Sequence, residues 1–312
     1  MKEKIVIITG ANSGIGKDAT LKFAKKGYTI IMACRSIERS KPVLNEIISA
    51  SGNEKIFLKE VDISSFASIC LFCDDFISQF QKLDILINNA AYFNHGEDYC
   101  LSSDNIELTF ATNVVGPFLM TNLLLDHLKK SDDARILNPC SSIIKHFFSP
   151  NKKIDFNNLQ GITDTKYNHS VYESYRDSKM AFLILTFKMA KEFKNFGIKV
   201  NSLQINGAKM SKETLKKFNP AWRLIAKIQN LYFPLPEVMA NIYFEICTSG
   251  KYKSTTGEYF NHKQEIMETG PESPRIRDIL GTSYYPAYAK NVELNDKIWN
   301  LCKDLTSKKN AL

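Results

Sequence analysis

Tyr175 and Lys179 are the residues of this chain whose types and spacing most directly suggest chemistry. Because they stand four positions apart, they share one face if the segment is a helix. A phenol with its ordinary pKa of about 10 is a poor acid–base group near neutral pH. A neighbouring ammonium stabilises the phenolate and lowers that pKa. The pair therefore predicts an acid–base group tuned by its neighbour, and Tyr172, four positions before Arg176, is the competing tyrosine.

A glycine-rich turn near the start of the chain is suited to a phosphate-bearing ligand. Residues 9–16 (TGANSGIG) follow the apolar run 5–8 and open a helix-like stretch at 15–26. At such a helix N-terminus, free backbone N–H groups and the helix dipole favour an anion, and missing side chains let it approach. We therefore expect a pyrophosphate here, contacted by Gly10, Asn12, Ser13, Gly14, Ile15, Gly16 and Lys17.

Strand-like and helix-like segments alternate along the chain, which indicates right-handed βαβ units. We predict a single-domain α/β Rossmann fold with a doubly wound, mostly parallel seven-stranded sheet and helices on both faces. Gly27 is expected to cap the first helix. The expected strands are 5–8, 29–33, 56–61, 85–87, 135–138, 199–205 and 258–260, and the expected helices are 15–26, 37–50, 65–81, 106–128, 175–194 and 235–247.

Three stretches, 146–171, 209–236 and 262–289, interrupt this alternation. Long excursions at the carboxyl edge of an open sheet commonly cover a substrate. We assign residues 4–260 to the core, 209–236 to a substrate-loop region and 261–312 to a C-terminal extension. The middle stretch carries an apolar cluster that fits a hydrophobic substrate, an interfacial helix on a membrane, or plain core. Its members are Trp222, Leu224, Ile225, Ile228, Leu231, Tyr232 and Phe233.

The overall composition argues against several classes of function. The net charge of +8 is scattered without a basic tract, which disfavours nucleic acid and suits an anionic cofactor. No apolar run reaches the roughly 20 residues of a membrane span, and the early first strand leaves no room for a signal peptide or anchor. The seven cysteines favour a reducing compartment, the cytoplasm, over a disulfide framework. Cys70 and Cys73 lack further ligands nearby, so we expect no metal site.

In their order and context, the motifs resemble those of the short-chain dehydrogenase/reductase family over residues 4 to about 260. The resemblance rests on TGANSGIG at 9–16, NNAA at 88–91, Asn113, the serine pair at 141–142 and YRDSK at 175–179. It implies hydride transfer between a nicotinamide cofactor and a carbonyl or alcohol. Tyr175 would exchange a proton with the substrate oxygen, and Lys179 would lower its pKa and hold the nicotinamide ribose. Asn113 would complete a proton relay.

The resemblance also implies a serine that orients the substrate carbonyl. Alignment on Arg135 and Asn138 selects Ser141, whereas alignment on the serine pair itself selects Ser142; we prefer Ser141. Pro139 departs from the family pattern. Because proline removes an N–H donor, we expect a local bend near the end of this strand.

Cofactor preference depends on the end of the second strand, where NAD-preferring members carry an acid that binds the ribose 2′-hydroxyl. This chain has Arg35 there, and Lys17 follows the glycine turn. A guanidinium suits a 2′-phosphate, so we expect NADP(H). The alternative is that Arg35 only stacks on adenine, with mixed cofactor use.

Further cofactor contacts follow from the resemblance alone. Asp62 would contact the adenine, and Asn89 and Ala90 would line the adenosine ribose. Gly207 would support the carboxamide. Asn206 replaces a proline that is common in the family, so we expect a less rigid turn there.

Two branches of the family fit equally: the retinol dehydrogenase-like group, through TGANSGIGK and the ACR motif at 33–35, and the protochlorophyllide reductase-like group, through NNAAYF at 88–93. Both indicate a hydrophobic carbonyl or alcohol substrate. The competing hypothesis, motivated by Pro139 and Asn206, is an NADPH-binding regulator or scaffold that has lost turnover. The sequence leaves monomer or homodimer open, and with it peripheral contact with a membrane.

Overall fold

The computed structural model describes residues 3–93, 99–159, 170–216, 218 and 220–307. Its centre is a seven-stranded sheet in the order β3-β2-β1-β4-β5-β6-β7, and every neighbouring pair is parallel. The predicted doubly wound sheet is therefore confirmed. The strands are β1 (Ile5–Thr9), β2 (Thr29–Cys34), β3 (Ile56–Glu60), β4 (Ile85–Ile87), β5 (Arg135–Ser141), β6 (Lys199–Ile205) and β7 (Tyr259–Phe260).

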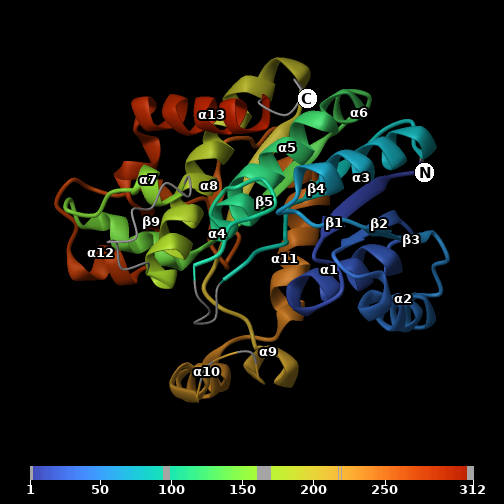
Figure 1. Cartoon of the computed structure of the whole chain (residues 1–312), viewed down its shortest axis with the longest axis horizontal. Coiled ribbons are helices and arrows are strands. Elements are labelled where there is room, and N and C mark those ends of the chain that lie inside the picture. Colours follow the sequence, from blue (N-terminus) through green and yellow to red (C-terminus); the bar gives the residue numbers. More distant parts are fainter. Residues whose placement is uncertain (1–2, 94–98, 160–169, 217, 219, 308–312) are drawn as a thin grey trace.

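Helices cover both faces of this sheet (Figure 1). One hydrophobic cluster packs α3, α5, α8 and α13 on one face, and a second packs α1, α2 and α11 on the other. The α-helices are α1 (Gly14–Lys25), α2 (Ile37–Ser51), α3 (Phe66–Gln79), α4 (Leu108–Phe110), α5 (Gly116–Leu123), α6 (Leu125–Lys129), α7 (Phe156–Leu159), α8 (Val171–Phe193), α9 (Lys212–Lys216), α10 (Pro220–Tyr232), α11 (Pro236–Thr248), α12 (Ile276–Leu280) and α13 (Val292–Ser307).

Local sequence explains the ends of these elements. All residues of β1 and β2 are buried, as continuous apolar runs require in a parallel sheet covered on both faces. The side chains of Ser36, Ser65 and Ser170 accept backbone N–H bonds at the starts of α2, α3 and α8. The predicted cap after α1 is confirmed, because Gly27 has a φ of +76°.

Two expectations about local structure are wrong. The expected helix at 106–128 is divided into α4, a π-helical turn at Ala111–Val115, α5 and α6. The expected bend at Pro139 is absent, because β5 pairs with β6 from Arg135 to Ser141. In a parallel sheet, the backbone N–H and carbonyl groups of successive residues bond alternately to the strand on one side and to the strand on the other. The Leu137 carbonyl accepts from the Asn88 N–H, on the β4 side. Pro139 points the same way, beyond the end of β4, where the ladder requires no N–H donor.

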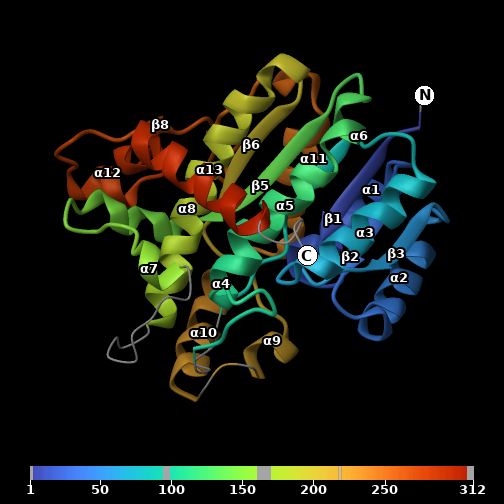
Figure 2. The same ribbon diagram turned by 45° about the horizontal axis from the view of Figure 1, so that its top comes forward.

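Beyond the seven strands the chain adds two structured segments. Residues 209–236 form α9 and α10, which project from the body in both views (Figures 1 and 2). The C-terminal extension forms a small parallel sheet, β8 (Glu268–Thr269) with β9 (Tyr284–Tyr285), followed by α13. In the described part of the chain, every helix is too short or too polar to cross a bilayer.

Candidate active site

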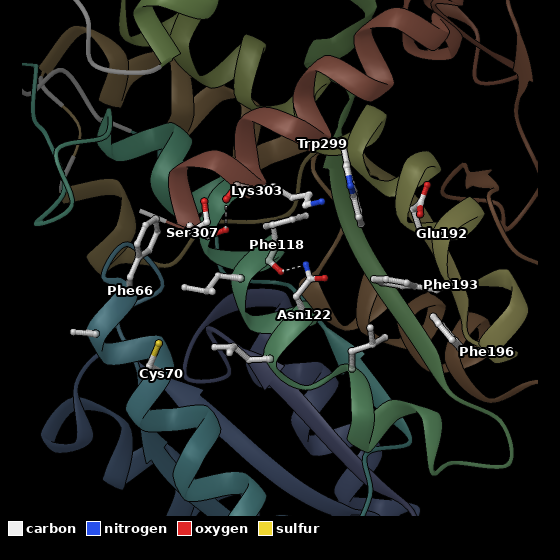
Figure 3. Close-up of a pocket in the computed structure, with 15 residues that line it drawn as sticks. Phe66, Cys70, Phe118, Asn122, Glu192, Phe193, Phe196, Trp299, Lys303 and Ser307 are labelled. Atoms are coloured by element: carbon white, nitrogen blue, oxygen red, sulfur yellow. Dashed lines mark hydrogen bonds between the residues drawn. The ribbon is translucent and has the colours of Figure 1, made fainter. Parts of the chain in front are cut away.

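A cleft of about 250 Å³ opens at the carboxyl edge of the sheet. It brings together Ser141, Tyr175, Lys179 and Gly207, which were singled out on separate motifs. Its lining residues are Ile15, Asn89, Ala91, Pro139, Cys140, Ser141, Tyr175, Lys179, Ile205, Asn206, Gly207 and Tyr243. A larger groove of about 760 Å³ lies elsewhere, between α3, α5 and α13 (Figure 3), and none of the predicted site residues lines it.

Tyr175 and Lys179 both line this cleft from helix α8. The Lys179 ammonium lies 5.7 Å from the centroid of the Tyr175 ring and donates to the Pro139 carbonyl at 3.5 Å. Tyr172, the competing tyrosine, points away: it is exposed and its hydroxyl contacts His146 Nε2 at 2.7 Å. Its partner Arg176 is engaged by Glu173 and Asp177.

The pKa of Tyr175 is not lowered as the pair predicts. Burial raises it to about 12, the adjacent Cys140 thiol adds to this, and a hydrogen bond with the Ser141 side chain lowers it. Burial also lowers the pKa of Lys179. The ammonium stands beside the aromatic ring and contacts a carbonyl, so it does not offset the loss of water around the phenol. The protein alone therefore holds Tyr175 as a protonated phenol at neutral pH.

Ser141 ends β5 and lies in the cleft, whereas Ser142 begins the following 3₁₀ helix and does not line it. The Ser141 hydroxyl also accepts the Ile143 N–H at 3.3 Å, which holds the oxygen beside Tyr175. Of the two serines left open by the sequence, Ser141 is the one that the fold brings to the tyrosine.

Asn113 lies in the π-helical turn and joins three segments. Its Oδ1 accepts the Tyr92 N–H at 2.7 Å, and its Nδ2 donates to the Tyr92 carbonyl and to Ser178 Oγ at 2.9 and 3.0 Å. The Ser178 hydroxyl in turn donates to the Tyr175 carbonyl at 2.8 Å. The side chain of Asn113 thus fixes the loop after β4 against the helix that carries Tyr175 and Lys179.

The glycine turn is built for close approach. A Cβ on Gly16 would stand 2.3 Å from the Gly10 carbonyl oxygen and 2.5 Å from Asn89 Nδ2, so only glycine fits. Asn89 holds the turn by donating to the Thr9 carbonyl at 2.9 Å, and the Ala90 N–H donates to Thr9 Oγ1 at 2.8 Å. The turn after β1 is therefore locked to the loop after β4.

The start of α1 has the features of an anion site. Within the described part of the chain, Ser13 makes no side-chain bond to the first helical N–H groups, and the first turn holds no acid. Asn12 donates instead to Ser40 Oγ at 2.8 Å, away from the helix end. Gly14, at φ +51°, has open space where a side chain would stand. The residues present fit the pyrophosphate of a dinucleotide.

Comparison with known proteins agrees with this geometry. A family model described as short chain dehydrogenase matches residues 4–149. Retinol dehydrogenase 13 of Homo sapiens is 32% identical over 271 residues, which are 83% of this chain and 76% of the relative. Retinol dehydrogenase 11 of Mus musculus is 30% identical over 261 residues, 84% of this chain and 78% of the relative. The chain belongs to the short-chain dehydrogenase family. Its relatives place it in the retinol dehydrogenase type.

Solved structures share the fold of this short-chain dehydrogenase at lower identity. One from Mycobacterium paratuberculosis is 20% identical, covers 97% of this chain and 93% of its own, and has a TM-score of 0.67. A short chain dehydrogenase of Shigella flexneri, complexed with NADP, is 20% identical, covers 84% and 98%, and has a TM-score of 0.63. The alignment with human retinol dehydrogenase 11, 35% identical, covers 64% of this chain and only 59% of that relative.

The two predicted phosphate-binding cations of this dehydrogenase, Lys17 and Arg35, differ in whether an acidic side chain pairs with them. The Lys17 ammonium is paired with Glu46 on α2, at 2.7 Å from both carboxylate oxygens. Arg35 follows β2 and is exposed, and among the described residues no acidic side chain pairs with it. Asp62, after β3, accepts the N–H and the hydroxyl of Ser64 at 2.9 and 2.6 Å. Arg35 is therefore the cation free to meet an anion at this edge.

The turn after β6 contains Asn206, where the sequence predicted a less rigid turn. Asn206 Oδ1 accepts from Gln204 Nε2 at 2.7 Å, and its Nδ2 contacts His262 Nδ1 at 3.0 Å. The expected loosening of the turn is thus countered by two side-chain contacts. Gly207 has a φ of +136°, and a Cβ there would stand 2.5 Å from the Phe233 ring. Phe233, from the segment after α10, thereby packs against a turn that lines the cleft.

Sequence reasoning missed Tyr243, Cys140 and His262. Tyr243 lies on α11, lines the cleft and donates to Asn89 Oδ1 at 3.2 Å. Cys140 Sγ lies 3.2 Å from the Lys179 carbonyl. Tyr243 and His262 stand in segments that no motif marks, so only the three-dimensional arrangement connects them to the site. Cys140 was recognisable as the residue beside Ser141.

Proposed function

We propose that this short-chain dehydrogenase transfers a hydride between NADP(H) and the carbonyl or alcohol of a hydrophobic small molecule. The observation that carries the proposal is the convergence of Tyr175, Ser141 and Lys179 in one cleft with the glycine turn. Relatives named retinol dehydrogenase support an alcohol or carbonyl as the reacting group. Solved neighbours complexed with NADP and NADPH support a nicotinamide nucleotide.

In this proposal the chain orients the substrate oxygen and moves one proton. Ser141 donates a hydrogen bond to that oxygen, and Tyr175 donates its phenolic proton to it during reduction or removes the alcohol proton during oxidation. Lys179 holds the ribose of the bound cofactor. Asn113 completes the relay while it anchors Ser178. When bound, the nicotinamide supplies or accepts the hydride.

Several residues are assigned to the dinucleotide on the same basis. The start of α1, with Ser13, Gly14 and Ile15, would hold the pyrophosphate. Arg35 would bind the 2′-phosphate, which favours NADP(H). Lys17 is paired with Glu46 and would contact a phosphate only after that pair opens. Asp62, Asn89 and Ala90 would line the adenosine, and Gly207 the carboxamide. The hydrophobic substrate class rests on the names of the relatives and on the apolar side chains of the cleft, Ile15, Ile205 and the neighbouring Phe233.

The test replaces Tyr175 by Phe. We expect Y175F to bind NADPH with a Kd within about twofold of wild type and to lose at least about 10²-fold in kcat, because only the transferable proton is removed. Retinaldehyde and a panel of aliphatic and aromatic aldehydes serve as substrates, followed through NADPH absorbance. Y172F is the matched control, since it removes the hydroxyl of the neighbouring tyrosine outside the cleft.

Unchanged turnover in Y175F would remove this tyrosine from the acid–base role. Tight NADPH binding by the wild type without hydride transfer to any member of the panel would instead favour the NADPH-binding regulator.

A further inference from the structure

Helix α10 is attached to the protein by its polar side. Arg223 donates to the carbonyls of Leu215, Lys216 and Phe218 at 2.9 to 3.2 Å. Asn230 forms a two-way clamp with the backbone of Met210, at 2.7 and 2.9 Å. With Ala226, which is buried, these residues recur every three or four positions and so define one face of the helix. This inward face is held mainly by hydrogen bonds.

The opposite face of α10 is apolar and lies in solvent. At 100° per residue, its side chains occupy an arc centred directly opposite Ala226. Leu231 is 74% and Tyr232 83% exposed, although leucine on a soluble helix normally faces inward. The reading of this cluster as plain core is therefore wrong. The arc, called here the outward face, consists of Leu224, Ile225, Ile228, Leu231 and Tyr232.

Basic residues outnumber acidic ones in the segment that carries the outward face. Residues 209–235 contain six basic residues and one acidic residue, in a chain whose net charge is +8. Lys212, Lys216 and Lys227 of α9 and α10 are exposed. An apolar helical face flanked by lysines matches the surface of a bilayer with anionic headgroups, where the apolar side chains enter the acyl boundary and the ammonium groups meet phosphates. A second copy of the chain would instead bring two positively charged segments together.

We infer that the α9–α10 segment docks this protein on an anionic lipid surface through the outward face. Figures 1 and 2 show the two helices projecting from the body, so a planar surface reaches them without meeting the sheet. The docking is peripheral and needs no span. It goes beyond the proposed reaction, because binding to lipid requires no cofactor and no proton transfer.

The docking segment adjoins the cleft. Its base is closed where the Lys209 N–H donates to the Pro234 carbonyl at 2.8 Å. Just before that proline, Phe233 packs over Gly207, which lines the cleft with Tyr175. A protein resting on lipid through α10 therefore has its docking segment joined directly to a turn that lines the cleft.

The experiment is co-sedimentation of the full chain with extruded vesicles, either of phosphatidylcholine alone or with phosphatidylserine added. We expect wild-type protein to bind the anionic vesicles more tightly than the neutral ones. The variant L224Q/I228Q/L231Q removes three side chains of the outward face and should lower the partition coefficient at least about tenfold on both. K212Q/K216Q/K227Q should lower it up to about 100-fold on anionic vesicles only.

The matched control is L71Q/I276Q/L280Q, whose side chains are 72%, 76% and 75% exposed but lie on other elements. It should bind vesicles as wild type does. All variants should keep the wild-type Kd for NADPH, which shows that they are folded, because none of the changed residues lines the cleft.

Equal vesicle binding by wild type and L224Q/I228Q/L231Q, or no binding by wild type, would overturn the inference. A lipid-free dimer that this triple variant dissociates would also overturn it, by assigning the outward face to a second copy. Failure of the Y175F test leaves this result untouched, since sedimentation measures no turnover.

Discussion

At the scale of single residues, Arg35 carries the proposed choice between NADPH and NADH. Its guanidinium stands at the end of β2 without a carboxylate partner among the described residues. A charge-assisted contact to phosphate is lost, and repulsion added, when the residue becomes acidic. We expect R35D to lower the ratio of kcat/KM for NADPH over NADH by about 100-fold. Steady-state kinetics with both nucleotides measure this ratio.

K4D is the control for R35D. It makes the same change of charge at the amino end of β1, the opposite edge of a parallel sheet. If K4D lowers the ratio as much as R35D does, the effect is one of net charge. If neither variant changes the ratio of kcat/KM for NADPH over NADH, Arg35 does not bind the 2′-phosphate.

The candidate site shows which residue properties a sequence reveals. The helical spacing of Tyr175 and Lys179, and their place in one cleft, followed from the pattern. The raised pKa of Tyr175 did not follow from the pattern, because the effect of burial on that pKa outweighs the effect of one ammonium placed beside the ring. Nor did the pairing of Lys17, since its partner Glu46 lies on another helix. Charges and burial at a site are set by neighbours that the motif does not contain.

At the scale of elements, the glycine turn and α1 form one tightly packed unit. A methyl group on Gly16 would collide with the Gly10 carbonyl and with Asn89 Nδ2, which holds the turn. We expect G16A to lower the free energy of unfolding by about 1–3 kcal/mol and to weaken NADPH binding at least about tenfold. Denaturant unfolding and fluorescence titration measure the two effects.

G250A is the matched control, because a Cβ on Gly250 would meet nothing within 4 Å. It should change the free energy of unfolding by less than about 0.5 kcal/mol and leave NADPH binding unchanged. Equal effects of the two substitutions would mean that the contact between α1 and the loop after β4 is dispensable.

The strands were predictable because parallel strands are continuous apolar runs, and each of the seven lies where its run predicted. The local irregularities in helices and strands were not predictable. The π-helical turn at Asn113 is stabilised by contacts of Asn113 with Tyr92 and Ser178, which lie in other elements. Pro139 lies in an unbroken strand because the pairing of β4 with β5 ends at Leu137, two residues earlier, so no N–H donor is needed at Pro139. The extent of β4 cannot be predicted from the proline itself. The two departures that motivated a regulator are thus accommodated, Pro139 by this register and Asn206 by Gln204 and His262.

At the scale of the whole molecule, the α9–α10 segment and helix α13 both lie outside the sheet, but their apolar faces point in opposite directions relative to the core. The α9–α10 segment turns its apolar side outward, whereas α13 turns its own inward and completes the larger hydrophobic cluster with Ile298 and Cys302. Periodicity alone reveals an apolar face but not its direction. That direction depends on whether a complementary surface exists, as α8 and α5 provide for α13.

Trp299 is the residue through which the docking of α13 can be tested. Its ring packs edge-on against Phe118 of α5, with centroids 5.2 Å apart, and against Phe193 of α8 at 6.4 Å. Asp296, one turn earlier on α13, pairs with Lys188 of α8 at 2.8 Å, but its carboxylate side is 55% exposed and so the pair contributes little. The tryptophan therefore adds two aromatic contacts to an interface that also buries Ile298 and Cys302.

We expect W299A to lower the free energy of unfolding by about 2–4 kcal/mol, since truncating a large packed aromatic removes its apolar contacts with Phe118 and Phe193. In a chain of 312 residues that corresponds to a fall in Tm of about 3–6 °C. V292A, an exposed position on the same helix, should change Tm by less than about 2 °C. The Kd for NADPH should be unchanged in both, because the groove that Trp299 lines shares no residue with the cleft (Figure 3). Equal Tm values for W299A and wild type would mean that α13 is an appendage, and the extension would then be free to leave the core without cost to the fold.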